Sequence, residues 1–135
     1  MLRAMGVVPA SVAVLGGRLK VGVEHSTLVS LAERGAQGSS ASLWKVGRRE
    51  LGAALLNKHV DAGTTVSATL AAARLAGISV FATGGIGGVH RGAGVSFDIS
   101  SDLVALSDTP DMAVVCAGCK SICTSLFPLG KSSKS

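Results

Sequence analysis

The segment at residues 78–92 constrains the fold most strongly, because a short apolar run there opens directly into a glycine-rich loop. Residues 78–82 are apolar apart from Ser79, as is typical of a strand buried in an α/β sheet. The loop that follows has four glycines and ends in His90 and Arg91. Glycines let backbone N–H groups approach a ligand, and successive N–H groups form a concave anion site. The segment therefore predicts a buried strand that ends either at a small-molecule site or at a tight turn.

The rest of the chain alternates β-prone runs with helical stretches. Two β-prone runs around Gly16 and Gly17 predict a hairpin. We expect strands at 11–15, 18–23, 43–46, 78–82 and 112–117, and helices at 26–34, 48–58, 66–76 and 102–106. Apolar strands separated by helices favour parallel pairing. The predicted fold is α/β, with a mixed sheet, an N-terminal hairpin and parallel strands flanked by helices. In such sheets ligands bind beyond the carboxyl ends of the strands.

Side chains at the predicted helix starts and strand ends indicate where the helices begin and where a ligand site lies. Ser26 or Thr27 is expected to cap the first helix, and Ser100 or Ser101 the last. The loop at 83–84 and the segment at 118–120 both follow predicted strands, so we expect them to converge on one site.

The composition excludes several classes of protein. A chain of 135 residues forms one domain at most, and 47% hydrophobic against 16% charged residues indicates a buried interior. The net charge of +5 is scattered, and only four aromatic residues (one Trp, three Phe) are present, so we expect no nucleic-acid binding. No apolar run is long enough to cross a bilayer, and no cleaved signal is evident. We expect an intracellular protein, in the cytoplasm, with a mitochondrial location left open and no membrane partner.

The three cysteines are Cys116, Cys119 and Cys123. Cys116 and Cys119 form a C-x-x-C pattern, which occurs in redox and zinc sites. A structural zinc site needs four ligands, however, and a second pair is missing. We interpret these cysteines as small buried residues of a strand and a turn.

Polar residues gather after the glycine loop. His90 and Arg91 lie on the loop itself and are predicted to bind substrate. Asp98 and Asp102, with Ser100 between them, offer the oxygen ligands that Mg²⁺ and Mn²⁺ prefer. The alternative is a loop carboxylate, a first-turn acidic residue and a helix cap.

Lys120 directly follows an apolar strand. A lysine near buried surface has a lowered pKa, and its neutral amine attacks carbonyl carbons. The alternative is an ordinary surface lysine.

Nine short motifs occur in an order that resembles the pseudouridine-5′-phosphate glycosidase family, also called the indigoidine synthase A-like family. They are Val-Pro-Ala at 8–10, Leu-Gly-Gly at 15–17, Leu-Lys-Val-Gly at 19–22, Lys-Val-Gly-Arg-Arg-Glu-Leu at 45–51, Gly-Thr-Thr-Val at 63–66, Leu-Ala-Gly-Ile at 75–78, the glycine loop at 81–92, Phe-Asp-Ile-Ser at 97–100 and Val-Val-Cys-Ala-Gly-Cys-Lys-Ser-Ile at 114–122. The resemblance covers about residues 6–122, and the glycine loop and the lysine motif are its most specific parts.

The resemblance implies a reaction and roles for individual residues. It implies reversible cleavage of pseudouridine 5′-phosphate to uracil and ribose 5-phosphate, with a divalent metal, typically Mn²⁺, and a trimeric assembly. It implies that Lys120 is the nucleophile and that Asp98 holds the metal. The residues implied to contact substrate are Lys45, Val66, Ser100, Ser101 and Asp102. An amine bonded to C1′ of the opened sugar is an electron sink that lets the uracil carbon depart as a carbanion, so a lysine suits this C–C bond.

The sequence also departs from the family pattern. It lacks the Ala-Leu-Glu-Ser-Thr motif whose glutamate is the implied proton donor, and the resemblance stops at Cys123. Gly47 replaces a serine of the pattern and Glu50 an aspartate. We therefore expect a truncated member, incomplete relative to the family fold, with a partial glycosidase domain at 1–122 and a divergent, disordered tail at 123–135. Its turnover should be impaired, because general acid–base catalysis contributes about 10²–10⁴-fold.

Two alternatives remain open. In the first, the chain is an inactive isoform that associates with full-length subunits or only binds sugar phosphate. In the second, it is a generic nucleotide-binding module. Co-purification with intact enzyme and a comparison of adenine nucleotides with ribose phosphate would distinguish them.

Overall fold

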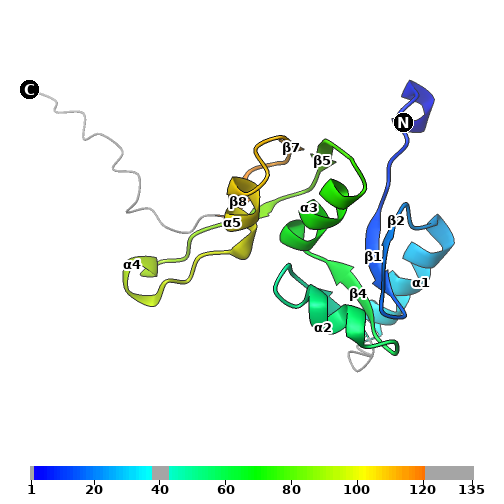
Figure 1. Cartoon of the computed structure of the whole chain (residues 1–135), viewed down its shortest axis with the longest axis horizontal. Helices are drawn as coiled ribbons and strands as arrows, with labels where there is room; N and C mark the ends of the chain where they lie inside the picture. Colours follow the sequence, from blue (N-terminus) through cyan, green and yellow to red (C-terminus); the bar gives the residue numbers. More distant parts are fainter. Residues whose placement is uncertain (1, 38–42, 121–135) are drawn as a thin grey trace, which may run out of the picture.

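The structure is a computed structural model that describes residues 2–37 and 43–120. After a short 3₁₀ helix, η1 (Leu2–Met5), the chain forms a four-stranded sheet, and three helices accompany it (Figure 1). The strands are β1 (Val12–Leu15), β2 (Arg18–Val21), β3 (Leu43–Val46) and β4 (Asp61–Thr64). The helices are α1 (His25–Ala36), α2 (Leu51–Leu56) and α3 (Val66–Leu75).

The sheet is mixed, with the strand order β2-β1-β4-β3. β1 pairs antiparallel with β2 and with β4, whereas β3 and β4 are parallel. The predicted hairpin is confirmed: Gly16 and Gly17 adopt φ values of 54° and 71°, which a primed two-residue turn requires. The sequence did not predict β4, because Asp-Ala-Gly-Thr contains little of the β-branched and aromatic character of strands.

Two of the three helices in this part begin at other residues than predicted. α1 begins after Glu24, so the prediction that Ser26 or Thr27 caps it was wrong. α2 begins only at Leu51, because Gly47 N–H donates to Glu50 Oε2 over 2.9 Å and closes a turn before the helix. α3 begins after Thr65, as predicted.

The second half of the chain forms two further pairs of strands and two short helices. These elements are β5 (Val80–Ala82), β6 (Ile86–Gly87), α4 (Ala93–Ser96), α5 (Ser101–Ser107), β7 (Ala113–Val115) and β8 (Cys119–Lys120). β5 pairs with β7 and β6 with β8, both in parallel, which confirms the predicted parallel pairing. Ser100 caps α5, since its Oγ accepts a hydrogen bond from Asp102 N–H at 3.2 Å.

The described residues form two hydrophobic cores, and helix α3 contributes Val66 and Leu70 to the second. The first core consists of Val14, Val46, Ala54, Val60 and Ala62. The second consists of Val66, Leu70, Ile86 and Ala105, with Phe81 and Val114 of β5 and β7 packed against it. The burial of α3 explains why its sequence is rich in alanine and leucine: small residues let neighbouring elements approach it closely.

The cysteines lie in different surroundings. Cys116 is half-buried against the second core, as expected, whereas Cys119 is exposed, so the prediction of a buried residue was wrong there. Cys123 and the predicted tail at 123–135 lie outside the described residues. Within the described ranges, no helix has the length and apolar character to cross a membrane.

Candidate active site

A cavity of about 820 Å³ lies where β3, the start of α3, the glycine loop, the start of α5 and β8 meet. Its lining consists of residues 43–45, 47, 50, 63–66, 83, 85–87, 100–102 and 120. The predicted site residues among them are Lys45, Val66, Ser100, Ser101, Asp102 and Lys120. The structure thus brings together predicted site residues that are up to 75 positions apart in the sequence, from Lys45 to Lys120.

Lys120 lies beside the glycine loop. In the parallel pair of β6 and β8 it is opposite Gly87, and Ile86 N–H donates to Gly118 O at 3.1 Å. A Cβ atom on Gly85 would lie 3.4 Å from Lys120 Cε, so the lysine side chain passes directly over this glycine. The predicted convergence of the two strand ends is therefore confirmed. Lys120 is exposed among the described residues, in contrast to the buried setting suggested by the sequence.

Lys45 reaches the cavity from β3. Its register partner on β4 is Gly63, and open space surrounds the position that a Cβ atom of Gly63 would take. Lys45 is exposed, and no described hydrogen bond or ion pair of its side chain is present. With Lys120, it gives the cavity two cationic groups, which favour an anionic ligand.

A chain of hydroxyl groups lies at the start of α3 and reaches α5. Thr65 Oγ1 is 3.1 Å from Ser67 Oγ, which is 3.4 Å from Ser101 Oγ. Ser67 Oγ also accepts a hydrogen bond from Arg48 N–H at 3.1 Å. Sequence reasoning missed Ser67, which is completely buried. Its position in the first turn of a helix that follows a strand was the available signal.

Asp102 is buried under the glycine loop. Its side chain accepts two backbone hydrogen bonds, from Ser67 N–H to Oδ1 and from Gly87 N–H to Oδ2, both at 2.9 Å. Gly87 packs so closely on the start of α5 that a Cβ atom would lie 2.0 Å from Ser100 Oγ. Asp102 thus joins α3, the glycine loop and α5.

His90, Arg91 and Asp98 do not line this cavity. All three lie within residues 89–99, and an antiparallel bridge between Val89 and Ile99 joins the two ends of this segment. Helix α4 lies at the far end of the segment (Figure 1). His90 N–H donates to Asp98 O at 3.1 Å, and His90 Nδ1 lies 3.9 Å from Asp98 Oδ2. His90 and Asp98 therefore lie side by side, and neither they nor Arg91 belong to the lining of the cavity that holds the two lysines.

The metal prediction rests on Asp98. Its side chain is 63% exposed, and His90 Nδ1 lies 3.9 Å from its Oδ2. Among the described residues, no three His, Cys, Asp or Glu side chains are close enough to share a metal ion. The donors that these residues supply do not form a Mn²⁺ site by themselves, since Mn²⁺ prefers several oxygen ligands.

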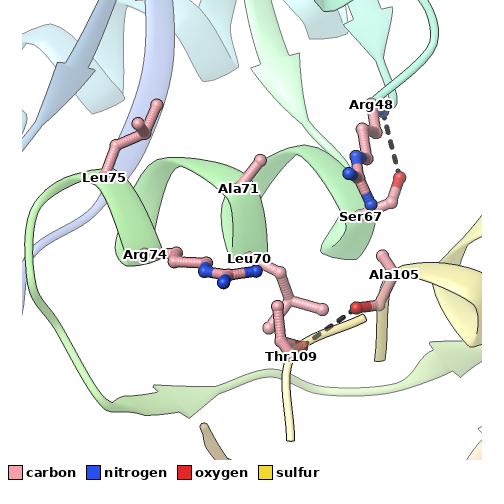
Figure 2. Close-up of a pocket in the computed structure, with 8 residues that line it drawn as sticks. All are labelled: Arg48, Ser67, Leu70, Ala71, Arg74, Leu75, Ala105 and Thr109. Carbon is pink, nitrogen blue, oxygen red and sulfur yellow. Dashed lines mark hydrogen bonds between the residues drawn. The ribbon is translucent and has the colours of Figure 1, made fainter. Parts of the chain in front are cut away.

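A second cavity, of about 520 Å³, lies between α3 and α5 (Figure 2). Arg48 Nη1 contacts Asp108 Oδ2 at 2.6 Å, and Arg74 Nη1 donates to Asp108 O at 3.1 Å. Both guanidinium groups therefore bind the C-terminal end of α5, where positive charge is favourable. None of the predicted site residues lines this cavity.

Comparisons with known proteins show which proteins this chain is similar to. The model of the family described as indigoidine synthase A like protein matches residues 1–125. The chain is 54% identical over 121 residues to a pseudouridine-5′-phosphate glycosidase of Sorangium cellulosum, which covers 90% of this chain and 36% of that protein. It is 50% identical over 121 residues to a pseudouridine-metabolizing bifunctional protein of Schizosaccharomyces pombe, of which it covers 15%.

Two solved structures share the fold. The prealnumycin C-glycosynthase AlnA, crystallised in complex with ribulose 5-phosphate, matches with a TM-score of 0.72 and 40% identity over 88% of this chain and 37% of that one. An indigoidine synthase A-like protein of Thermotoga maritima matches with a TM-score of 0.71 and 32% identity, over 87% and 36% of the two chains. The chain thus spans little more than a third of the length of most of these relatives. Because the family model matches nearly all of the chain, the chain belongs to the indigoidine synthase A-like family.

Proposed function

We propose that this chain carries the sugar-phosphate half of a pseudouridine-5′-phosphate glycosidase site, in which the Lys120 amine bonds to C1′ of the sugar. The observation that carries the proposal is the placement of Lys120 and Lys45 on one cavity beside the glycine loop. The names of the similar glycosidases supply the reaction, and the ribulose 5-phosphate complex of AlnA supplies the ligand class.

Binding of the sugar phosphate follows from the charges around the cavity. Lys45 and Lys120 attract the phosphate, and Ser100 and Ser101 line the same cavity with hydroxyl groups. Gly85 leaves room for a ligand next to the Lys120 side chain, because it has no Cβ atom. Val66 contributes an apolar patch at the start of α3. These groups are expected to hold C1′ within reach of the amine.

The covalent step requires the unprotonated amine of Lys120. Its nitrogen bonds to C1′ and the C1′–O4′ bond breaks; the nitrogen then loses a proton, which restores its lone pair, and O4′ takes up a proton as the sugar ring opens. The C–C bond to uracil then breaks: the nitrogen lone pair forms C=N, the bonding pair leaves on the uracil carbon, and that carbon takes up a proton. Water hydrolyses the imine, which releases ribose 5-phosphate and the free amine.

Two carboxyl groups take no part in this mechanism. Glu50 lines the cavity, but its Oε2 already accepts a hydrogen bond from Gly47 N–H, so we assign it no proton transfer. The role of Asp98 as a Mn²⁺ ligand stays a prediction, and no step is routed through a metal. Full turnover belongs to relatives of which this chain spans about a third, so a test of the sugar half is the sharper one.

Borohydride trapping tests the proposal directly. The protein is incubated with ribose 5-phosphate and borohydride, which reduces the imine to a stable secondary amine, and its peptides are mapped by mass. We expect the adduct on the peptide that contains Lys120 and none on the variant Lys120→Arg. Lys58→Arg, which removes an exposed lysine away from the cavity, is the matched control and should keep the adduct.

A second variant tests the binding role of Lys45. Lys45→Gln should raise the half-saturating ribose 5-phosphate concentration about tenfold, because a hydrogen bond to a charged group contributes about 1.5–3 kcal/mol. An adduct spread evenly over surface lysines, or one that survives Lys120→Arg, would overturn the proposal.

A further inference from the structure

We propose that Asp102 is a positioning residue, which holds the glycine loop and through it Lys120, and does not act by contact with the sugar phosphate. The part that concerns Lys120 rests on the proposed function. The resemblance of the sequence implies that this aspartate binds substrate. The hydrogen bonds and burial of its side chain point to another role.

Both carboxylate oxygens of Asp102 are engaged by the backbone. Oδ1 accepts from Ser67 N–H and Oδ2 from Gly87 N–H, each at 2.9 Å, and the residue is only 8% exposed. Ser67 lies in the first turn of α3, where N–H groups have no partner within the helix. Asp102 supplies that partner and places a negative charge at the positive end of α3.

The second oxygen connects Asp102 to the lysine. Gly87 is the register partner of Lys120 in the parallel pair of β6 and β8, so an atom that fixes Gly87 also fixes the strand beside the lysine. The contact depends on glycine, because a Cβ atom on Gly87 would lie 2.9 Å from Asp102 Oδ2 and 2.0 Å from Ser100 Oγ. The neighbouring residue, Ile86, donates its N–H to Gly118 O at 3.1 Å and holds the two strands together.

Charge argues in the same direction. A carboxylate directed at a sugar phosphate would repel the phosphate dianion, which the two lysines attract. A carboxylate that accepts two backbone N–H groups is stabilised as the anion within the protein. Asp102 can thus line the cavity without acting as a ligand for the phosphate.

The test compares Asp102→Asn with the wild type by two measurements. The first is amide hydrogen exchange at Ser67, Gly87 and Ile86, which requires no sugar. The second is the rate of borohydride trapping on Lys120 as the ribose 5-phosphate concentration is raised. Asp108→Asn is the matched control, because it changes a carboxylate at the other end of the same helix, away from this cavity.

The expected result is faster exchange at Ser67 or Gly87 and at Ile86 in Asp102→Asn. The asparagine side chain keeps one accepting oxygen and turns an NH₂ group toward the other N–H. The saturated trapping rate should fall about tenfold, since small misplacements of a reacting group are costly. Asp108→Asn should change neither measurement.

Three outcomes would overturn the proposal. The first is unchanged exchange at Ser67 and Gly87 in Asp102→Asn. The second is a rise in half-saturating sugar concentration with an unchanged saturated rate, which identifies a substrate ligand. The third outcome applies if Asp102→Asn does not fold, and it is measured on the wild type. It is amide exchange at Ser67 or Gly87 that is as fast as in an unfolded chain. A wild type that forms no adduct contradicts the proposed function alone, while the exchange data still decide the role of Asp102.

Discussion

Three glycines of one loop should respond differently to alanine, and the difference tests how closely this loop packs on α5. At Gly87 the new Cβ atom would lie 2.0 Å from Ser100 Oγ, 2.6 Å from Ser100 Cβ and 2.9 Å from Asp102 Oδ2. All of these are shorter than contacts that real Cβ atoms make. Gly87→Ala must therefore displace the loop or the start of α5.

The cost of Gly87→Ala has two parts. Overpacking of a well-packed site typically costs about 1–3 kcal/mol. Displacement also weakens the Gly87 N–H bond to Asp102, and hydrogen bonds to charged groups contribute about 1.5–3 kcal/mol. Partial relaxation reduces both, so we expect a loss of about 3 kcal/mol in the free energy of unfolding. Urea titration followed by circular dichroism measures this loss as a lower midpoint.

Gly84 and Gly85 are the controls in the same loop. Apart from its chain neighbours, no atom of the described residues lies within 4 Å of the position that a Cβ atom of Gly84 would take. Its φ is not in the left-handed region either, so Gly84→Ala should be neutral or slightly stabilising. At Gly85 the new atom would meet the end of the Lys120 side chain at 3.4 Å and Gly118 O at 3.7 Å. Gly85→Ala should leave stability unchanged and slow the trapping of Lys120. Equal midpoints for Gly87→Ala and Gly84→Ala would refute the reasoning.

Two further predictions concern stability. Burial raises the pKa of Asp61, but the hydrogen bonds from Arg34 and Gly16 N–H outweigh it, so this pKa lies below its ordinary value of 3.8. Asp61→Asn should lower the free energy of unfolding by about 1–2 kcal/mol at pH 7. Because the folded-state pKa of Asp61 is depressed, the difference in stability from the wild type should vanish as the pH falls below 3.8. An equal difference at pH 2 would contradict this reasoning. Leu70→Ala should cost about 2–5 kcal/mol, because Leu70 is completely buried in the second core. Leu75→Ala on the same helix, at an 82% exposed residue, should cost under about 0.5 kcal/mol, and equal urea midpoints for the two variants would contradict the burial argument.

Much of the local structure could be predicted from the sequence. The hairpin around Gly16 and Gly17, the strand at 43–46 and the helix after Thr65 follow from turn glycines, apolar runs and caps, which act over a few residues. The parallel pairs followed from apolar strands separated by helices. The nine motifs also identified the family correctly.

Strands that form only through their neighbours could not be predicted in this way. β4 has little intrinsic strand preference, and it is extended because β1 and β3 pair with it on either side. β6 is part of the glycine loop and becomes a strand only where β8 lies beside it. In both cases pairing between distant segments overrides local preference.

The candidate site divides in the same way. The sequence by itself determined which groups are present: two lysines, a glycine loop and the serines and aspartate at the start of α5. Only the tertiary structure decided which of them meet. His90, Arg91 and Asp98 are close to the glycine loop in sequence, yet the bridge from Val89 to Ile99 separates them from the cavity.

Asp102 shows the physical reason most clearly. Its partner Ser67 is 35 residues away, and a hydrogen bond of 2.9 Å between them depends on how α3 packs against α5. Sequence spacing fixes the types and the local directions of side chains, since these depend on neighbouring backbone angles. The distances between elements depend on packing of the whole core, and this packing made Asp102 a partner of the backbone.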